Sequence, residues 1–186
     1  MEFAHVNQSE KRVDVYEKVT GKAKYGADMK FPDMLYAEVL HTEYPYAKII
    51  SIDTSKAEKM PGVKAVITAQ DIPNNEFGVI IENQQVLAKE KALYIGDGVA
   101  IVAAETPKQA KKAKEAIKVE YEELEGIYDP LKSRESGAQL VHDELENNEV
   151  IHHPLRKGDV SEGFKNSDVI LEREYSTPFI EQSYIK

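Results

Sequence analysis

The chain has 186 residues, no cysteine and a formal net charge of −9 at pH 7. The lack of cysteine excludes a disulfide, a thiolate zinc site and an iron–sulfur cluster within this chain, and the acidic balance argues against binding of nucleic acid, which needs a basic face. Residues 1–118 carry equal numbers of acidic and basic side chains, so the whole excess of negative charge lies in residues 119–186. This break predicts a folded domain followed by an acidic, looser segment.

The first 33 residues are predicted to be an extended lead-in. Glycine, proline and aspartate recur in "VTGKAKYGADMKFPDM" at turn spacings, without the apolar stripe of a helix. The N-terminus is charged and lacks the apolar core of a signal peptide, and no run of the sequence approaches the ~18 apolar residues that cross a membrane. We therefore expect a soluble, cytoplasmic protein without a membrane contact.

Residues 34–125 hold most of the predicted regular structure. Apolar and polar residues alternate in residues 35–43, which predicts a strand and places His41 on its apolar face as a packed histidine. Thr106 followed by Pro107, with a glutamine three positions after the threonine, marks the start of the main helix. Strands outnumber helices and come in mixed order, so the predicted class is α+β, a mixed sheet with few helices. In chain order the predicted strands are residues 35–43, 48–55, 63–69, 92–95, 98–105, 119–124 and 168–180, and the predicted helices are residues 56–60, 106–118 and 159–167.

Residues 70–91 are the irregular part of this domain. A proline, two asparagines and a glycine come before an apolar run, Val79-Ile80-Ile81. A loop of this length inside a compact domain is uncommon, and it is more often functional than decorative.

Gly96-Asp97-Gly98 lies between two apolar runs, where glycines could cradle a phosphate, bind a cation or turn the chain. A dinucleotide-binding loop needs a third glycine and a helix directly after it, whereas Ile101 occupies the third position and a strand follows. Asp97 stands alone, without the spaced carboxylates of a calcium loop. The motif therefore predicts a tight turn between antiparallel strands, with Gly and Asp supplying the positive φ.

The remaining candidates favour no chemistry of their own. His152 and His153 are adjacent and point in opposite directions in an extended chain, so a solvated loop is favoured over a metal site. The carboxylates of Glu120, Glu122 and Glu123 are better explained as the open face of a strand than as a pair for acid–base work. No serine or threonine sits in a nucleophile elbow. We therefore predict no catalytic, cofactor-binding or metal-binding residue in this chain.

Three stretches, in their order and spacing, resemble the xanthine dehydrogenase and aldehyde oxidase family. They are "KVTGKAKYGADMKFPDMLYAEVLHTEYPYAKIISIDTSKAEKMPGVKAVITAQDIP" (18–73), "VLAKEKALYIGDGVAIVAAETPKQAKKAKEAIKVEYEEL" (86–124) and "GDVSEGFKNSDVILEREYSTPFIEQSYI" (158–185). The resemblance is to the N-terminal α/β hammerhead domain of the large, molybdenum-binding subunit. It implies an extended lead-in at 1–33, the hammerhead domain at 34–125, an acidic loop-rich segment at 126–157, and a bridging helix and strand at 158–186 that lead toward the molybdenum-binding domains.

Members of this family hydroxylate carbon centres next to nitrogen or oxygen and take the oxygen atom from water. A molybdopterin-bound molybdenum accepts two electrons, which leave through iron–sulfur clusters and FAD to NAD or another acceptor. The resemblance therefore implies part of an oxidoreductase whose molybdenum-contacting residues and catalytic glutamate lie in later domains of the same chain. Iron–sulfur and flavin domains or subunits are the implied partners in an oligomeric holoenzyme. A purine such as xanthine, an N-heterocycle such as nicotinate, or an aldehyde is the implied substrate.

This chain is then expected to be a structural, channel-wall and subunit-contact domain that is inactive alone. By spacing, Ile80 and Ile81 match an apolar pair that lines the substrate funnel in family members, and packing on the domain's own sheet is the alternative. The sequence departs from the family at Tyr46, at the Gly-Asp-Gly turn, and at Gln182 and Lys186, where the family has His and Glu. The competing interpretation is a stand-alone scaffold or binding module that reuses the fold. A complete small enzyme is disfavoured because the chain has no catalytic set.

Overall fold

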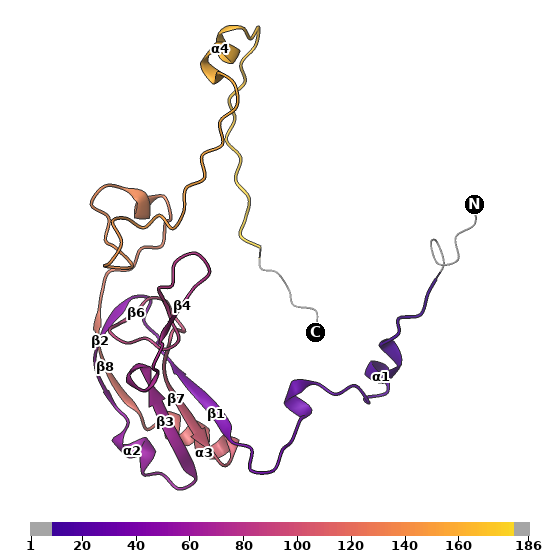
Figure 1. The fold of residues 1–186 in the computed structure, drawn as a ribbon, viewed down its shortest axis with the longest axis vertical. Coiled ribbons are helices and arrows are strands. Elements are labelled where there is room, and N and C mark those ends of the chain that lie inside the picture. The colour runs from indigo at the N-terminus through magenta and orange to yellow at the C-terminus, as the bar shows by residue number, and fades with distance from the viewer. Residues whose placement is uncertain (1–8, 181–186) are drawn as a thin grey trace. The chain divides into compact units, whose positions relative to one another are not determined.

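The computed structural model describes residues 9–180 of the chain (Figure 1). The chain divides into two compact units, Met1–Val150 and Ile151–Lys186. All strands of the described residues belong to the first unit, and every pairing between them is antiparallel. The strands are β1 (Tyr36–His41), β2 (Ala47–Asp53), β3 (Val63–Thr68), β4 (Glu76–Phe77), β5 (Gln84–Gln85), β6 (Lys91–Ala92), β7 (Gly98–Ala104) and β8 (Lys118–Glu123).

Two three-stranded sheets form the body of the first unit. One has the strand order β1-β7-β3 and the other the order β6-β2-β8, while β4 and β5 make a separate hairpin. β7 lies between two strands that are distant from it in the sequence, so that Ile101 is opposite both Val39 of β1 and Ile67 of β3. The α+β class predicted from the sequence is confirmed by this combination of sheets with a few short helices.

Helix α3 (Pro107–Lys114) packs on β1 and β7 (Figure 1). As predicted, it begins directly after Thr106, whose Oγ1 accepts a hydrogen bond from the backbone N–H of Gln109 at 3.3 Å. Its buried face consists of Ala110 and Ala113, and these small side chains allow the helix to approach the sheet closely. The other helices are α1 (Val15–Val19), α2 (Ser55–Glu58) and α4 (Val160–Lys165), and the short 3-10 turns are η1 (Gly26–Asp28), η2 (Ala69–Asp71) and η3 (Lys132–Arg134).

The core consists of two clusters of buried side chains that meet. Ile52 of β2 and Val119 of β8 pack against both clusters, so the two sheets and two of the helices, α2, which holds Ala57, and α3, share one continuous apolar interior. Branched and small side chains from neighbouring elements fill such an interior at close to crystalline density. The first cluster is Ala57, Ala100, Val102, Ala113 and Ile117, and the second is Ile49, Ala88, Ala92 and Val99.

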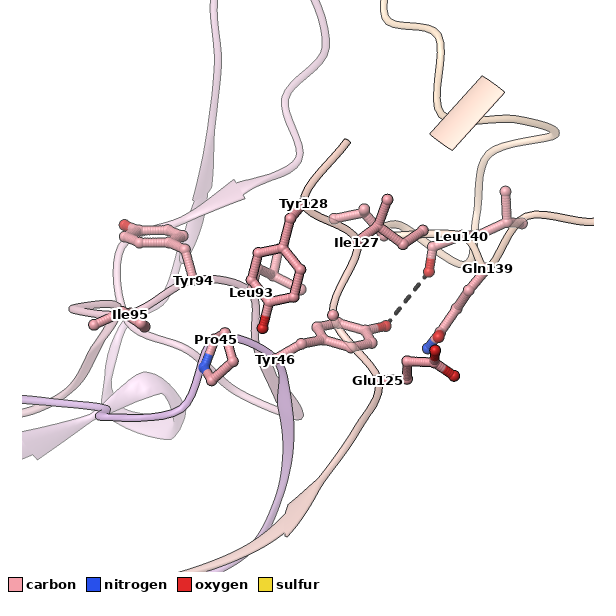
Figure 2. Close-up of a pocket in the computed structure, with 12 residues that line it drawn as sticks. Pro45, Tyr46, Leu93, Tyr94, Ile95, Glu125, Ile127, Tyr128, Gln139 and Leu140 are labelled. Carbon is pink, nitrogen blue, oxygen red and sulfur yellow. Dashed lines mark hydrogen bonds between the residues drawn. The ribbon is translucent and has the colours of Figure 1, made fainter. Parts of the chain in front are cut away.

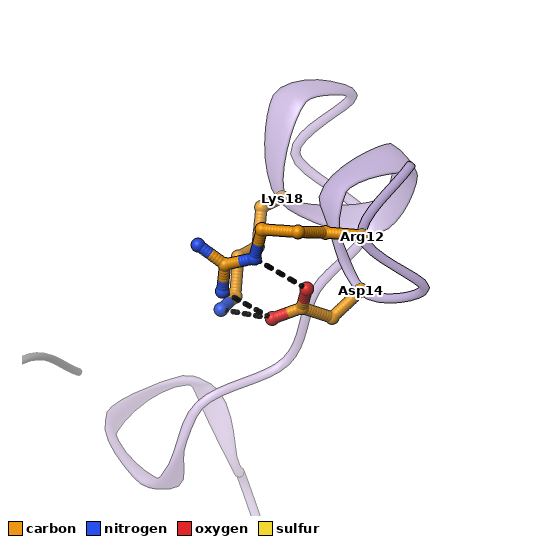
Figure 3. A network of polar contacts seen from close by, with 3 residues as sticks. All are labelled: Arg12, Asp14 and Lys18. Carbon is orange, nitrogen blue, oxygen red and sulfur yellow. Dashed lines mark hydrogen bonds and ion pairs between the residues drawn. The ribbon is translucent and has the colours of Figure 1, made fainter. Parts of the chain in front are cut away.

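The lead-in, predicted to be extended, contains helix α1. The carboxylate of Asp14, just before this helix, accepts hydrogen bonds from Nη2 of Arg12 at 3.0 Å and from Nζ of Lys18 at 2.5 Å (Figure 3). These two cations hold the pKa of the Asp14 carboxyl down at about 2, with the hydrogen bond from Lys18 as the larger cause. A local ion pair across one helical turn therefore stabilises α1. The sequence does not predict this helix, because it lacks an apolar stripe.

The prediction of a strand at residues 168–180 is wrong. Residues 151–180, in the second unit, contain no strand, and all of their side chains are exposed. A strand needs a neighbouring strand that forms hydrogen bonds with its N–H and C=O groups, and an alternation of apolar residues does not by itself provide that neighbour. The predicted helix at 159–167 is confirmed as α4, which Asp159 caps by accepting a hydrogen bond from the N–H of Glu162 at 3.0 Å. Gln182 and Lys186 lie outside the described residues.

Candidate functional site

The irregular loop at 70–91 contains an ordered β-hairpin, formed by β4 and β5. At its base, the side chain of Asn75 accepts a hydrogen bond from the backbone N–H of Leu87 at 3.0 Å and donates one to the carbonyl of Leu87 at 2.8 Å. Leu87 is only 1 % exposed. The hairpin is therefore fastened to the core through one asparagine and one leucine.

The apolar run lies at the tip of this hairpin. Val79 is fully exposed and Ile80 is 60 % exposed, so these side chains are not buried on the domain's own sheets. The tip turns tightly, because a Cβ on Gly78 would lie 1.9 Å from the carbonyl oxygen of Ile81, which leaves room only for glycine. An exposed apolar tip on a fastened hairpin is typical of a surface that meets a ligand or another part of a protein.

Ile80 and Ile81, which the sequence singled out, line a cavity of about 410 Å³. Its opposite side comes from the acidic segment that follows β8. The residues lining this cavity, which we call the tip pocket, are Gly78, Val79, Ile80, Ile81, Asn83, Gln84, Val141, His142, Leu145, Asn148 and Val150. The sequence indicated the isoleucines but gave no signal for the opposite side, because that side depends on how a loop folds.

A second cavity, of about 250 Å³, lies beside the start of β2 (Figure 2). Tyr46 forms its floor and is 5 % exposed, and its hydroxyl donates a hydrogen bond to the carbonyl of Leu140 at 3.4 Å. Tyr94, Ile95 and Tyr128 stand around it and are 60 %, 67 % and 78 % exposed. We call this second cavity and its rim the aromatic pocket. Tyr46 therefore serves here as a buried anchor between β2 and the acidic segment.

The Gly-Asp-Gly motif turns the chain, but it does not join two paired strands. β6, before the turn, belongs to the second sheet, and β7, after it, belongs to the first, so the predicted hairpin is wrong. Gly96 has a φ of +94°, as a glycine at a turn permits, whereas Asp97 has no positive φ. The sequence pattern could not distinguish a hairpin from a crossing between sheets, since both need a tight turn after an apolar run.

Asp97 instead stabilises the turn from inside. It is 6 % exposed, and its carboxylate accepts a hydrogen bond from the backbone N–H of Leu93 at 3.0 Å. Burial raises the pKa of the Asp97 carboxyl, while hydrogen bonds from Leu93 and Gly98 N–H groups lower it in part. Thr42 of the adjoining loop donates its N–H to the Asp97 carbonyl at 2.9 Å. Asp97 is thus a structural residue that positions Leu93 and Tyr94 at the aromatic pocket.

His41 is exposed, so the prediction of a packed histidine is wrong. Leu40, on the other face of β1, is the residue that packs against the core beneath α3. Both faces of this strand carry apolar side chains, and the position of the helix decides which face is covered. Nδ1 of His41 lies 2.7 Å from the carbonyl oxygen of Gly96, so the ring contacts the same turn.

The other candidate groups are not brought together. His152 and His153 are exposed in the second unit, and residues 9–180 contain no group of three or more His, Cys, Asp or Glu side chains that could hold a metal. Glu120, Glu122 and Glu123 are exposed along β8, and Glu120 accepts a hydrogen bond from Ser51 at 3.2 Å. Among the described residues, no helix is both long and apolar enough to cross a membrane.

Comparisons with known proteins give one consistent result. Residues 20–125, more than half of the chain, match the domain described as "Aldehyde oxidase and xanthine dehydrogenase, a/b hammerhead domain". The chain is 45 % identical over 177 residues to a probable xanthine dehydrogenase subunit of Bacillus subtilis, covering 94 % of this chain and 23 % of that protein. It is 40 % identical over 186 residues to the nicotinate dehydrogenase large molybdopterin subunit of Eubacterium barkeri, covering 100 % of this chain and 43 % of that protein.

Among solved structures, the aldehyde oxidoreductase from Desulfovibrio gigas matches with a TM-score of 0.74 and 29 % identity, covering 85 % of this chain and 19 % of that one. The chain therefore spans less than half of the length of these relatives.

Proposed function

The chain belongs to the aldehyde oxidase and xanthine dehydrogenase family, and from this membership we propose that it is the N-terminal part of the molybdopterin-binding subunit of a molybdenum hydroxylase. That enzyme would hydroxylate a purine, an N-heterocycle or an aldehyde with oxygen from water. The similarity to a nicotinate dehydrogenase large molybdopterin subunit along the whole of this chain supports the proposal. Molybdopterin would supply the two-electron oxidation, and iron–sulfur and FAD domains or subunits would take up the electrons.

The role proposed for this chain within that enzyme is to form a wall of the substrate channel. One observation carries this role: Ile80 and Ile81 stand at the exposed tip of a fastened hairpin and line a cavity of about 410 Å³. Small-molecule sites have volumes of roughly 300–1,000 Å³ and mostly apolar walls. Because the family resemblance implies that the molybdenum-contacting residues and the catalytic glutamate lie in later domains, we assign no step of the reaction itself to a residue of this chain.

The channel-wall role is tested by Ile80→Arg in the complete enzyme. An arginine at the tip places a charge on an apolar wall, so we expect KM for the substrate to rise about tenfold or more while molybdenum content stays unchanged. Val86→Arg is the matched control, because Val86 is an exposed apolar residue in the same loop outside the tip pocket. A KM that does not move in Ile80→Arg would refute the role.

The aromatic pocket is the proposed contact with the remaining molybdenum-binding domains of the same chain. Exposed Tyr94, Ile95 and Tyr128 form an apolar surface around it, and aromatic side chains of this kind dominate the energy of protein contacts. Tyr46 fixes the floor of this surface.

The enzyme assignment is tested by capturing the native protein with an antibody against this domain. A large chain that carries close to one molybdenum per molecule supports the assignment. A polypeptide near 21 kDa, without molybdenum or a metal-bearing partner, would favour a stand-alone binding module instead.

A further inference from the structure

The tip pocket is enclosed by two segments that are far apart in the sequence. The hairpin supplies every residue from 78 to 84 except Glu82, and five residues of the stretch 141–150 in the acidic segment supply the opposite side. We call this second segment the opposing loop. Val141, Leu145 and Val150 give it an apolar surface that matches Ile80 and Ile81 across the cavity.

The opposing loop is held in shape by one asparagine. Oδ1 of Asn148 accepts a hydrogen bond from the N–H of Val141 at 2.9 Å, and Nδ2 donates to the carbonyls of Ser133 at 3.0 Å and Gln139 at 2.9 Å. The ion pair of Arg134 with Glu149 at 3.1 Å closes the same stretch. A loop fastened in this way keeps its side of the pocket preformed, which reduces the entropy that a ligand must overcome on binding.

The polar groups that line the tip pocket are few. No aspartate, glutamate, lysine or arginine lines it. Asn148 uses its side-chain amide in hydrogen bonds to the backbone of the acidic segment, which leaves Asn83, Gln84 and His142 to meet a ligand. Nδ1 of His142 lies 3.5 Å from Oε1 of Glu144, so its Nε2 is the ring atom that a ligand would contact.

We propose that the opposing loop is the second wall of the substrate channel, and that His142 orients an uncharged ring compound as it passes between Ile80 and Leu145. This inference rests on the proposed function. Apolar walls bind the two faces of a flat ring, and a single imidazole hydrogen bond fixes its edge. A carboxylate on the same ring would lose its hydration without meeting a lysine or arginine of this pocket.

The experiment compares nicotinamide with nicotinate, because the two rings are identical and only nicotinate is charged. Dissociation constants for the intact holoenzyme are measured by titration calorimetry, which needs no turnover. We expect the wild type to bind nicotinamide more tightly than nicotinate. Leu145→Arg should weaken nicotinamide about tenfold or more, and His142→Phe about two- to tenfold, with partial recovery in His142→Gln.

Leu131→Arg is the matched control, because Leu131 is an exposed leucine of the same acidic segment outside the tip pocket. Leu145→Ala, expected to weaken nicotinamide severalfold, keeps the inference testable if the arginine variant does not fold. Molybdenum content is measured for each variant to show that the enzyme is intact.

The outcomes separate this inference from the proposed function. If Ile80→Arg weakens binding while the Leu145 and His142 variants match Leu131→Arg, the second wall is refuted and the tip keeps its role. If the substitutions at Ile80, Leu145 and His142 all leave binding unchanged, both the second wall and the channel-wall role of the hairpin tip are refuted. If the wild type binds nicotinamide no better than nicotinate, or not at all, the preference for an uncharged ring is refuted.

Discussion

Replacing Asp97 tests how the turn between the two sheets is stabilised. Asp97→Ala removes the acceptor of the Leu93 N–H, and an unpartnered buried donor costs about 1–3 kcal/mol. At 2–4 °C per kcal/mol for a chain of this size, the melting temperature should fall by about 2–12 °C. Asp97→Asn keeps an acceptor oxygen and removes the buried charge, so at pH 7 it should be at least as stable as the parent chain.

The contribution of the Asp97 carboxyl to the stability of the fold depends on pH. Burial raises the folded-state pKa of Asp97 above its ordinary value of 3.8, so the folded chain holds this proton more tightly than the unfolded chain. Its contribution to stability is therefore fully present below pH 3.8 and is lost as the pH rises through the raised folded-state value. Asp97→Asn should therefore be more stable than the parent chain only at a pH above the raised pKa of Asp97.

The assay is thermal and urea denaturation followed by circular dichroism, at pH 7 and at the lowest pH where the chain stays folded. Asp129→Ala is the matched control, because Asp129 accepts a similar hydrogen bond, from Leu131 N–H at 2.8 Å, at an exposed position where water replaces it. We expect the control to change stability by less than about 0.5 kcal/mol. Equal stabilities for Asp97→Ala and Asp97→Asn at pH 7 would refute the reasoning.

Three further predictions concern the hairpin and the lead-in. Leu87→Ala should lower the free energy of unfolding by about 2–5 kcal/mol, because Leu87 is almost fully buried, whereas Leu35→Ala at an exposed position should have little effect in the same urea titration. Gly78→Ala should rearrange the hairpin tip, because its Cβ would collide with the Ile81 carbonyl; hydrogen exchange should rise at the tip amides and not in β7, and unchanged tip exchange would contradict the prediction. The Asp14 carboxyl, followed by NMR, should titrate near pH 2 and move toward 3.8 in Lys18→Ala, so its support of α1 is complete above pH 3.8 and is lost as the pH falls through about 2.

The sequence predicts those helices whose ends are marked by capping residues. The Thr106 cap with Pro107 located α3, and Asp159 located α4. Of the strands in the body, those at 35–43 and 119–124 followed from their alternation, and those at 48–55, 63–69 and 98–105 from apolar and β-branched runs. The tip isoleucines were found through a family resemblance and through an apolar run in a polar loop, and the structure places them in a cavity.

What the sequence could not provide depends on partners distant along the chain. The face of β1 that is buried follows from where α3 packs, so His41 was assigned to the wrong environment. The turn at Gly96 connects different sheets, which no local pattern reveals. Residues 168–180 have the composition of a strand but no neighbouring strand among the described residues. His142 and Leu145 lie at the tip pocket because of the fold of their loop, which hydrogen bonds of Asn148 and the ion pair of Arg134 with Glu149 hold in shape.

The central place of β7 also affects how the protein is made. Within the described sheets, β1 and β3 do not pair with each other, and each has β7 as its partner. A ribosome produces roughly 5–20 residues per second, so β3 is made about 2–7 s, and β1 about 3–13 s, before the strand that joins them is complete. During that interval their unpaired edges are open to other chains. Synthesis that stops before Gly98 would release a product unable to build its first sheet, and we expect such a product to depend on chaperones or to aggregate.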